Sequence, residues 1–414
     1  MRKILPLIAS CLLLFNAAAF GQASPAPLTL QQVVDMYIKN NLDLQAARYK
    51  VERAKADEIA AKLRPNPSIS VTAENLAVSG PTSFNRLYEI GTTYSETIEL
   101  GGKRALREKA AAANVSAAEV QFEDTMRRGV ADIKRLYLEA LLAGYNVQIA
   151  GENRQTFEAL LKFNQTRFDE GATPELELIK VRLERVKVDS TISKARIASR
   201  QAVIRLLEKL AITDVTDRAV TGELRARPVS LDVNGLRQFA LNERADVRAA
   251  MAELNAANQR VALERARARP DISPFAGYKR VGNDNTVLAG VNIPLKVRDS
   301  NQAEIARAET DVRSAEVRLQ WVRNHVLAEV EAAVSGLQAS RELVDTFEKD
   351  LLQQADESNS ITLAAYEEGG TELLPVLEAQ RTRSEVRQEY FKTLFDYQAS
   401  VVALELAVGR EVQP

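Results

Sequence analysis

Two stretches of the sequence repeat each other, and this internal repeat constrains the fold more than any other feature. Residues 168–176 read FDEGATPEL and residues 366–374 read YEEGGTELL, which is a shift of 198 residues. Residues 118–120 (Ala-Glu-Val) recur at residues 315–317 with a shift of 197. Two related units of about 180–190 residues predict a pseudo-twofold chain, so the shape of one unit determines the whole.

The amino terminus is typical of a signal peptide, which we assign to residues 1–23. Two basic residues precede an apolar run over residues 4–20, and small residues near Ala23 offer a cleavage point. The sole cysteine, Cys11, lies inside this run. Cleavage near Ala23 predicts an exported chain without thiols, and the alternative is lipoprotein-like processing at Cys11.

The charge balance excludes one class of function. The formal net charge is −1, which is not the basic footprint of a nucleic-acid-binding protein. After the leader, no stretch approaches the ~20 apolar residues that a transmembrane helix requires. An exported chain can still cross a membrane through closed strands, because these satisfy every backbone group.

Each unit predicts the same order of elements: a helix, two strands, a long helix and a returning helix. The first helix of each unit ends at prolines, Pro65 and Pro67 in the first copy and Pro270 in the second. We expect a first repeat over 24–211, with a helix over 28–63, strands within 68–98 and helices over 103–168 and 174–210. A linker is expected over 212–230. We expect a second repeat over 231–409, with a helix over 231–268, strands within 271–296 and helices over 299–366 and 372–408, followed by a tail over 410–414.

Periodicity supports these elements. Residues 285–296 alternate apolar and polar side chains, which predicts a strand with one apolar face. Residues 305–351 carry apolar side chains at heptad spacing, with one stutter between Val326 and Val330. This pattern predicts a coiled coil whose winding changes at the stutter.

Glycines mark the places where the chain changes direction. Gly101 and Gly102 are expected to turn the chain from strand to long helix. Gly171 and the pair Gly369-Gly370 are expected to turn it between the two helices of each hairpin. Pro174 suits the first turn of the returning helix.

The doubled motif of an aromatic residue, two polar residues, glycine, a small residue and a leucine-rich helix resembles that of the TolC-like outer-membrane efflux proteins. The resemblance implies a mainly α fold with a membrane β-barrel part: long coiled-coil helical hairpins and two β-hairpins per chain. It implies a homotrimer with a barrel of about 12 strands, which is a permitted number, continued by an α-helical tunnel. The implied partners are a periplasmic adaptor (membrane fusion protein), an inner-membrane pump of the resistance–nodulation–division type and outer-membrane lipid.

A second motif narrows the resemblance. Residues 98–104 (IELGGKR), together with Glu74-Asn75, are similar to the cobalt–zinc–cadmium resistance (CzcC-like) subgroup, which implies divalent metal cations as cargo. The chain itself is not expected to bind the metal, because His325 is its only histidine and soft metals prefer imidazole and sulfur. We expect no cofactor and no catalysis, since GGKR lacks the residues of a phosphate loop.

The candidate site residues gather at the hairpin turns and at the strand–helix junctions. Acidic residues near the turns would form rings of carboxylates in a trimer, which favour cations, or they are solvated helix ends. The candidates are Asp169, Glu170, Glu367, Glu368 and Glu372 for the acidic entrance; Gly171, Thr173, Gly369, Gly370 and Thr371 for the turns and the adaptor contact; and Pro65, Pro67, Pro270, Gly101 and Gly102 for the junctions.

Three alternatives stay open on the sequence. A periplasmic coiled-coil adaptor or scaffold would also have long helical hairpins, but it does not need two strand pairs with an apolar face. A hydrolase would need a nucleophile–base group, and none is visible. Within the family, the cargo could be drugs, solvents or proteins instead of metal ions.

Overall fold

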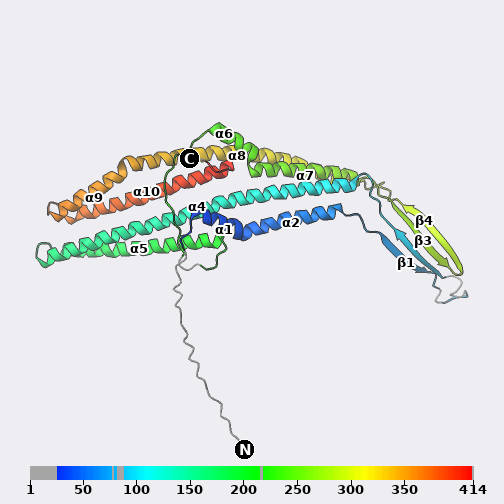
Figure 1. The fold of residues 1–414 in the computed structure, drawn as a ribbon, viewed down its shortest axis with the longest axis horizontal. Helices are drawn as coiled ribbons and strands as arrows, with labels where there is room; N and C mark the ends of the chain where they lie inside the picture. Colours follow the sequence, from blue (N-terminus) through cyan, green and yellow to red (C-terminus); the bar gives the residue numbers. More distant parts are fainter. Residues whose placement is uncertain (1–25, 77–78, 82–87, 215–217, 413–414) are drawn as a thin grey trace, which may run out of the picture.

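The protein is an elongated molecule with a β-sheet at one end and two helical tips at the other (Figure 1). The computed structural model describes residues 26–76, 79–81, 88–214 and 218–412. The expected leader with Cys11 lies outside the described residues. The short helices α1 and α6 lie near the middle of the long axis, so the long helices extend from this level in both directions (Figure 1).

The strands form one antiparallel sheet in the order β1-β2-β3-β4. Each expected strand pair is present, and β2 also pairs with β3, so the sheet joins the two copies. Ile69 lies opposite Tyr94, and Tyr94 lies opposite Ala276. Among the residues that the structure describes, each of the two outer strands has one edge without a strand partner. The bounds are Ser68–Glu74 (β1), Glu89–Ser95 (β2), Ser273–Val281 (β3) and Asp284–Asn292 (β4).

The helices follow the duplicated order that the repeat predicts, with three interruptions. The first helix of each copy is divided in two, and the long helix of the second copy contains a π-helical turn. The bounds are Leu30–Asn40 (α1), Leu42–Lys62 (α2), Lys103–Asp169 (α4), Glu175–Lys209 (α5), Val233–Glu243 (α6), Ala245–Arg267 (α7), Gln302–Thr346 (α8), Phe347–Leu351 (η1), Leu352–Glu367 (α9) and Leu373–Val408 (α10).

The helices expected over 28–63 and 231–268 are each broken at one residue that leaves the helical conformation. Asn41 caps α2, and its Nδ2 donates to the Lys209 carbonyl at the end of α5 at 2.9 Å. Arg244 precedes α7, and its Nη1 donates to the Ala407 carbonyl near the end of α10 at 2.7 Å. Both breaks therefore satisfy a carbonyl that the end of a helix leaves unpaired.

The helix expected over 299–366 is present as an uninterrupted helical run from Gln302 to Glu367, but it includes a π-helical turn that the sequence did not predict. Val326 and Val330 lie in regular α-helix, and both are fully buried. The chain departs from α-geometry further on, at the π-helix η1. Apolar spacing does not indicate this turn, because the apolar series continues through it at Phe347 and Leu351.

The molecule is an open slab. On the side away from the sheet, α5 packs on α4, α4 on α10, and α10 on α8 and α9. On the sheet side, α2 packs on α4, α4 on α7, and α7 on α8. The elements α2, α5 and β1 therefore lie along one edge, and α8, α9 and β4 lie along the other (Figure 1).

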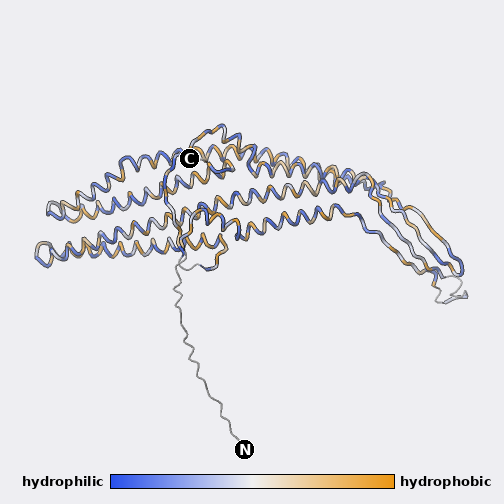
Figure 2. Tube along the Cα trace, viewed as in Figure 1, coloured by the Kyte–Doolittle hydropathy of each residue, from blue (hydrophilic) through white to orange (hydrophobic). Residues whose placement is uncertain are grey.

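The main hydrophobic core lies at the middle level. It joins α1 and α6 to the long helices through residues such as Val33, Ile133, Leu206 and Leu404. Apolar and polar residues alternate along every long helix (Figure 2). Within the described ranges, no helix has the length and apolar content needed to cross a membrane.

Removing the two helix-break side chains should destabilise the protein to different extents. We expect Arg244→Ala to lower the free energy of unfolding by about 2–3 kcal/mol, because it removes a buried guanidinium that pairs with Asp246 and Glu329 and leaves the Ala407 carbonyl without its donor. Asn41→Ala should cost about 1 kcal/mol, as for loss of a helix cap. Guanidinium unfolding followed by circular dichroism measures both. Arg318→Ala is the control: its 3.8 Å pair with Glu253 is exposed, so the loss should stay below about 1 kcal/mol.

Candidate functional site

The two turns at the helical tips have the same backbone geometry. Gly171 follows α4 with φ of 72°, its N–H donates to the Phe168 carbonyl at 2.9 Å, and the next N–H donates to the Arg167 carbonyl at 2.7 Å. Gly369 follows α9 with φ of 78°, and Gly370 N–H donates to the Ala365 carbonyl at 2.7 Å. This is the Schellman arrangement, in which a left-handed residue ends the helix.

Steric crowding is not the reason for these glycines. An added Cβ on Gly171 or Gly369 would meet no heavy atom within 4 Å. The positive φ alone therefore selects glycine at both positions. The structure thus places the predicted turn glycines at the extreme ends of the two hairpins (Figure 1).

The predicted acidic residues all lie exposed at these turns. Asp169 and Glu170 end the first hairpin's outgoing helix, and Glu367, Glu368 and Glu372 flank the second turn. None of them belongs to an ion pair within the part of the chain that the structure describes. Asp169 accepts a hydrogen bond from Gln165 Nε2 at 2.9 Å. Across the described ranges, these carboxylates therefore have no ion-pair partner.

Thr173, predicted as part of a contact surface, lies inside the first turn. Only 7% of the residue is exposed, and its hydroxyl donates to Glu177 Oε2 at 2.8 Å. Thr371, its counterpart at the second turn, is half-buried. Glycines and carboxylates, and not the threonine of the first turn, therefore form the exposed surface there.

Tyr366 is the residue that sequence reasoning missed. It is 1% exposed, and its hydroxyl donates to Asn164 Oδ1 at 2.6 Å, with a second contact to Glu177 Oε2 at 3.4 Å. Tyr366 ends α9, whereas Asn164 and Glu177 belong to the first hairpin. We call these contacts the tip link, because they join the two hairpins directly behind the turns.

The surroundings of the tip link keep the tyrosine neutral. Burial raises the pKa of Tyr366 above its usual value, and the Glu177 carboxylate raises it further. Phe163 packs against its ring edge-on at 5.9 Å between centroids. Asn164, fully buried, donates to the Leu160 carbonyl at 2.9 Å and is thereby oriented to accept from the tyrosine.

A signal for this residue was present in the repeat. The first position of the doubled motif is Phe168 in one copy and Tyr366 in the other. Phe168 is only half-buried, whereas Tyr366 is buried. The added hydroxyl is therefore the one difference that could have indicated a bond between hairpins.

Two further polar contacts connect the hairpins above the tip link. Gln380 Nε2 of α10 donates to Asn153 Oδ1 of α4 at 2.9 Å. Arg387 Nη1 donates to Glu152 Oε2 at 2.6 Å. A small apolar cluster lies between them and the turns. Its buried members are Phe157, Leu160, Val181, Val188, Tyr366, Leu373 and Val376.

The strand–helix junctions hold the predicted glycines and prolines, together with a buried lysine. Gly101 and Gly102 have φ of 76° and 70°. Lys103 is 6% exposed, and its Nζ donates to Asp271 Oδ1 and to the Arg269 carbonyl, both at 2.6 Å. The GGKR motif thus ties the first copy to the second. Pro65 and Pro67 lie between α2 and β1, and Pro270 lies between α7 and β3.

The two faces of the sheet differ in chemistry. Large apolar side chains on one face are exposed: Ile69 is 71% exposed and Val287 is 83% exposed. The opposite face carries Lys279, which pairs with Glu89 and lies 3.7 Å from Glu74. The sheet therefore presents one face suited to lipid and one suited to water.

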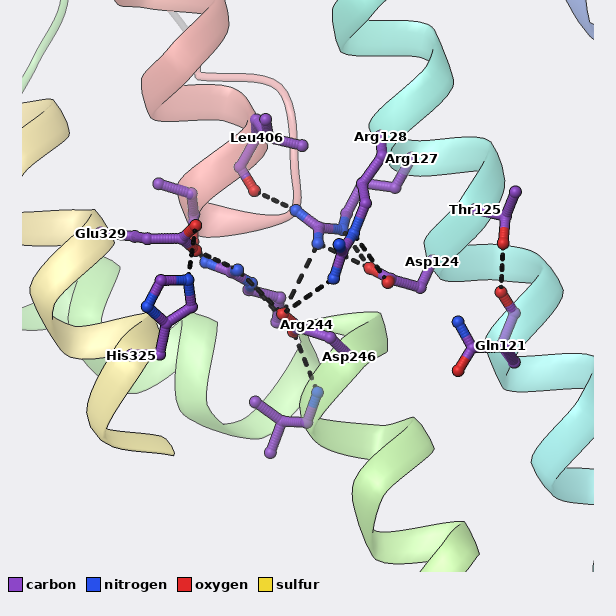
Figure 3. Close-up of polar contacts among 12 residues, drawn as sticks. Gln121, Asp124, Thr125, Arg127, Arg128, Arg244, Asp246, His325, Glu329 and Leu406 are labelled. Carbon is purple, nitrogen blue, oxygen red and sulfur yellow. Dashed lines mark hydrogen bonds and ion pairs between the residues drawn. The ribbon is translucent and has the colours of Figure 1, made fainter. Parts of the chain in front are cut away.

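A network of charges lies at the middle level, around the helix break at Arg244 (Figure 3). Arg127 donates to Asp124 and to the Leu406 carbonyl, and Arg244 pairs with Asp246 and Glu329. Burial lowers the pKa of Arg244, but the carboxylates of Asp246 and Glu329 raise it by more, so the pKa lies above its usual value. The network thus connects α4, α7, α8 and the end of α10.

His325 lies exposed at the edge of this network, with 46% of its side chain accessible in the single chain. Its ring stacks on Trp321 at 4.9 Å, and Nε2 lies 3.1 Å from Glu329 Oε1 (Figure 3). Among the residues that the structure describes, no group of three or more His, Cys, Asp or Glu side chains could hold a metal ion.

Comparison with known proteins identifies relatives along most of the chain. The family model described as "Outer membrane efflux protein" matches residues 33–211 and 236–410. The "Cobalt-zinc-cadmium resistance protein CzcC" of Cupriavidus metallidurans is 25% identical over 393 residues, covering 94% of this chain and 92% of that protein. The "Nickel and cobalt resistance protein CnrC" of the same organism is 28% identical, covering 76% of this chain and 74% of that protein.

Solved structures agree with the fold. The crystal structure of CusC has a TM-score of 0.76 with this chain at 22% identity, covering 92% of each chain. The CmeC outer membrane channel of Campylobacter jejuni has a TM-score of 0.78 at 19% identity, covering 93% of this chain and 86% of that one. At these identities the likeness concerns the fold alone.

Replacing either turn glycine should loosen its own tip. We expect Gly171→Ala and Gly369→Ala each to cost about 1–2 kcal/mol locally, the penalty of a left-handed residue with a Cβ. Amide hydrogen exchange of the last turns of α4 and α9 measures the effect. Gly336→Ala, inside α8 with open space around it, is the matched control and should stabilise the helix by about 0.5–1 kcal/mol. Equal effects at all three positions would contradict the conformational explanation.

Proposed function

The chain belongs to the outer membrane efflux protein family, and we propose that three copies form a passive duct for substrate between the periplasm and the exterior. The four-stranded sheet is its share of an outer-membrane barrel, and the helices continue the barrel as a tunnel. The energy for transport would come from an inner-membrane pump of the resistance–nodulation–division type, connected through a periplasmic adaptor.

The observation that carries this proposal is the open slab with two unpaired edges. Among the described residues, the outer edges of β1 and β4 have no strand partner, and a sheet that crosses a membrane must close so that such backbone groups are paired. Four strands from three chains give about 12, within the range of known barrels. Copies arranged in a ring would pair β4 of one chain with β1 of the next.

The helical edges support the same arrangement. Along α5, exposed apolar side chains recur at the spacing of a coiled-coil seam, as in Leu176, Ile179, Leu183 and Val186. The opposite edge exposes Trp321 and Leu343 on α8. A neighbouring copy that covers these stripes would bury apolar surface at both edges, which favours a closed ring of helices.

The hairpin tips would form the periplasmic entrance. The tip link holds the second hairpin against the first, so it stabilises one position of the entrance. The adaptor would bind the exposed turns, and opening would require Tyr366 to leave Asn164. Rings of Glu367 and Glu368 would then favour cations at the opening.

We propose divalent heavy-metal cations as the cargo. The support is the similarity to proteins named for resistance to cobalt, zinc, cadmium and nickel. Within the described residues no metal-binding group is present, so the duct would pass the ions and leave their selection to the pump. The "Toluene efflux pump outer membrane protein TtgF" of Pseudomonas putida is also similar to this chain, at 23% identity over 92% of this chain. Solvent export is therefore the alternative function.

Deleting the gene should lower tolerance to zinc, cobalt and cadmium in the native host, because the ions would no longer leave the periplasm. Growth inhibition on graded metal concentrations measures this, with several hydrophobic drugs tested in parallel. The wild-type gene restored in trans is the control. Unchanged metal tolerance together with lost drug tolerance would contradict the metal cargo and favour the alternative.

Neutralising the second turn should weaken cation preference. We expect a Glu367→Gln/Glu368→Gln channel in planar bilayers to show a reversal potential closer to zero under a salt gradient, because fewer carboxylates attract cations at the entrance. Glu357→Gln is the matched control, since this glutamate is also exposed on α9 but lies away from the turn. An unaltered reversal potential in the double variant would contradict the acidic ring.

A further inference from the structure

Between two repeated motifs, the long helix of the second copy contains one residue more than the long helix of the first. Residues 118–120 and 315–317 differ in number by 197, whereas residues 168–176 and 366–374 differ by 198. The extra residue therefore lies between residues 317 and 366. The π-helix η1, Phe347–Leu351, is the only departure from α-geometry that the structure shows in this interval. A π-turn is the usual way in which an α-helix absorbs one added residue.

Burial on either side of η1 agrees with this count. Above it, Val330 and Leu337 of α8 are buried, as are Ile133 and Ala140 of α4, which lie 197 positions earlier. Below it, Ala355 of α9 is buried like Phe157 of α4, 198 positions earlier. The π-turn thus keeps the same face of the helix inward on both sides while adding one residue.

Only the second hairpin has this irregularity. In the first copy, α4 runs without interruption from Lys103 to Asp169. In the second, α9 leaves the line of α8 beyond η1 (Figure 1). Sharp changes of helix direction are typical at π-turns, where the regular hydrogen-bond ladder is broken.

Packing changes abruptly at the same level. Val344, three residues before η1, is fully buried in the main core, but η1 itself contains no buried residue. Its contacts with α10 are a hydrogen bond from the Tyr390 hydroxyl to Glu348 at 3.2 Å and the Phe347 ring 6.3 Å from that of Tyr390. The helix is therefore held weakly at the point where its geometry is irregular.

Below η1, the hairpins are joined by few contacts. In the described part of the chain these include the Arg387–Glu152 pair, the Gln380–Asn153 hydrogen bond, the tip link, the Arg167 guanidinium 5.7 Å from the Tyr366 ring and the small apolar cluster around it. The Arg387–Glu152 pair is partly exposed, so it contributes little to holding the hairpins together. Just below the main core, the ring of Phe391 in α10 stacks on Tyr145 of α4 at 4.3 Å, which provides a fixed contact beside η1.

We propose that η1 is the hinge of the entrance: α9 and the adjoining half of α10 bend away from α4 and α5 about Phe347–Leu351, while the first hairpin stays straight. The inference rests on the proposed opening of the tips. The arm from η1 to the turn, α9, has 16 residues, which is roughly 24 Å of helix. A bend of about 20°, as π-turns produce, moves its end by roughly 8 Å.

Hydrogen exchange of the assembled wild-type protein tests the hinge without any substitution. We expect amides of residues 347–356 to exchange roughly tenfold faster than those of residues 150–158, the equivalent segment of α4. Deletion of the exposed Lys349 removes the extra residue and should bring the two rates together. Equal exchange of both segments in the wild type would overturn the hinge, whether or not the deletion variant folds.

Spin-label distances separate the hinge from the proposed opening. Cys11 is the only cysteine and lies in the expected leader, so introduced cysteines can be labelled selectively. One pair lies below η1, Lys162→Cys with Ser360→Cys, and a control pair lies above it, Arg135→Cys with Ala332→Cys. All four positions are exposed within the chain. Assemblies diluted with unlabelled chain report distances within one copy.

The two pairs are compared with and without Tyr366→Phe, which removes the tip link. We expect the lower distance to increase by roughly 5 Å or more, given the length of α9, and the upper distance to stay unchanged. An equal increase in both pairs would overturn the hinge but keep the opening of the tips. If neither distance increases, the tip link is not the contact that closes the entrance. The hydrogen-exchange measurement alone would then test the hinge.

Discussion

The rest of the structure depends on two side-chain hydrogen bonds to helix ends at the middle of the molecule. Asn41 and Arg244 each leave the helical conformation and donate a side-chain hydrogen bond to a carbonyl at the end of the last helix of their own repeat. The unpaired carbonyls at a helix end need such partners when they are buried. Each repeat is thereby closed at this level, and the helices extend freely from it toward the membrane and toward the tips.

Much of the fold follows from local signals in the sequence. The prolines before the strands, the alternating strand residues and the turn glycines each act within a few residues, so the element order could be predicted. The breaks at Asn41 and Arg244 could not, because the carbonyls they bind lie 168 and 163 residues away. Local periodicity continues through both breaks, and only the tertiary contact explains them.

The candidate site shows the same division between local and distant causes. The doubled motif located both turns and their carboxylates, since a positive φ selects glycine regardless of the neighbours. Tyr366 was not recognised, because its partner Asn164 comes from the other repeat, 202 residues away. The π-helix was not predicted, although the difference between the two repeat shifts places one extra residue in the interval 317–366 that contains it.

The unpaired edges of the sheet have a consequence for the chain before it assembles with other copies. Every residue of β1 is solvent-exposed in the single copy, and an exposed strand margin readily pairs with any other extended chain. In the proposed trimeric arrangement, a single copy would therefore be prone to aggregation until two others join it. During assembly, correct association of the copies would therefore compete with incorrect strand pairing. Periplasmic chaperones that cover the exposed strands would favour correct association.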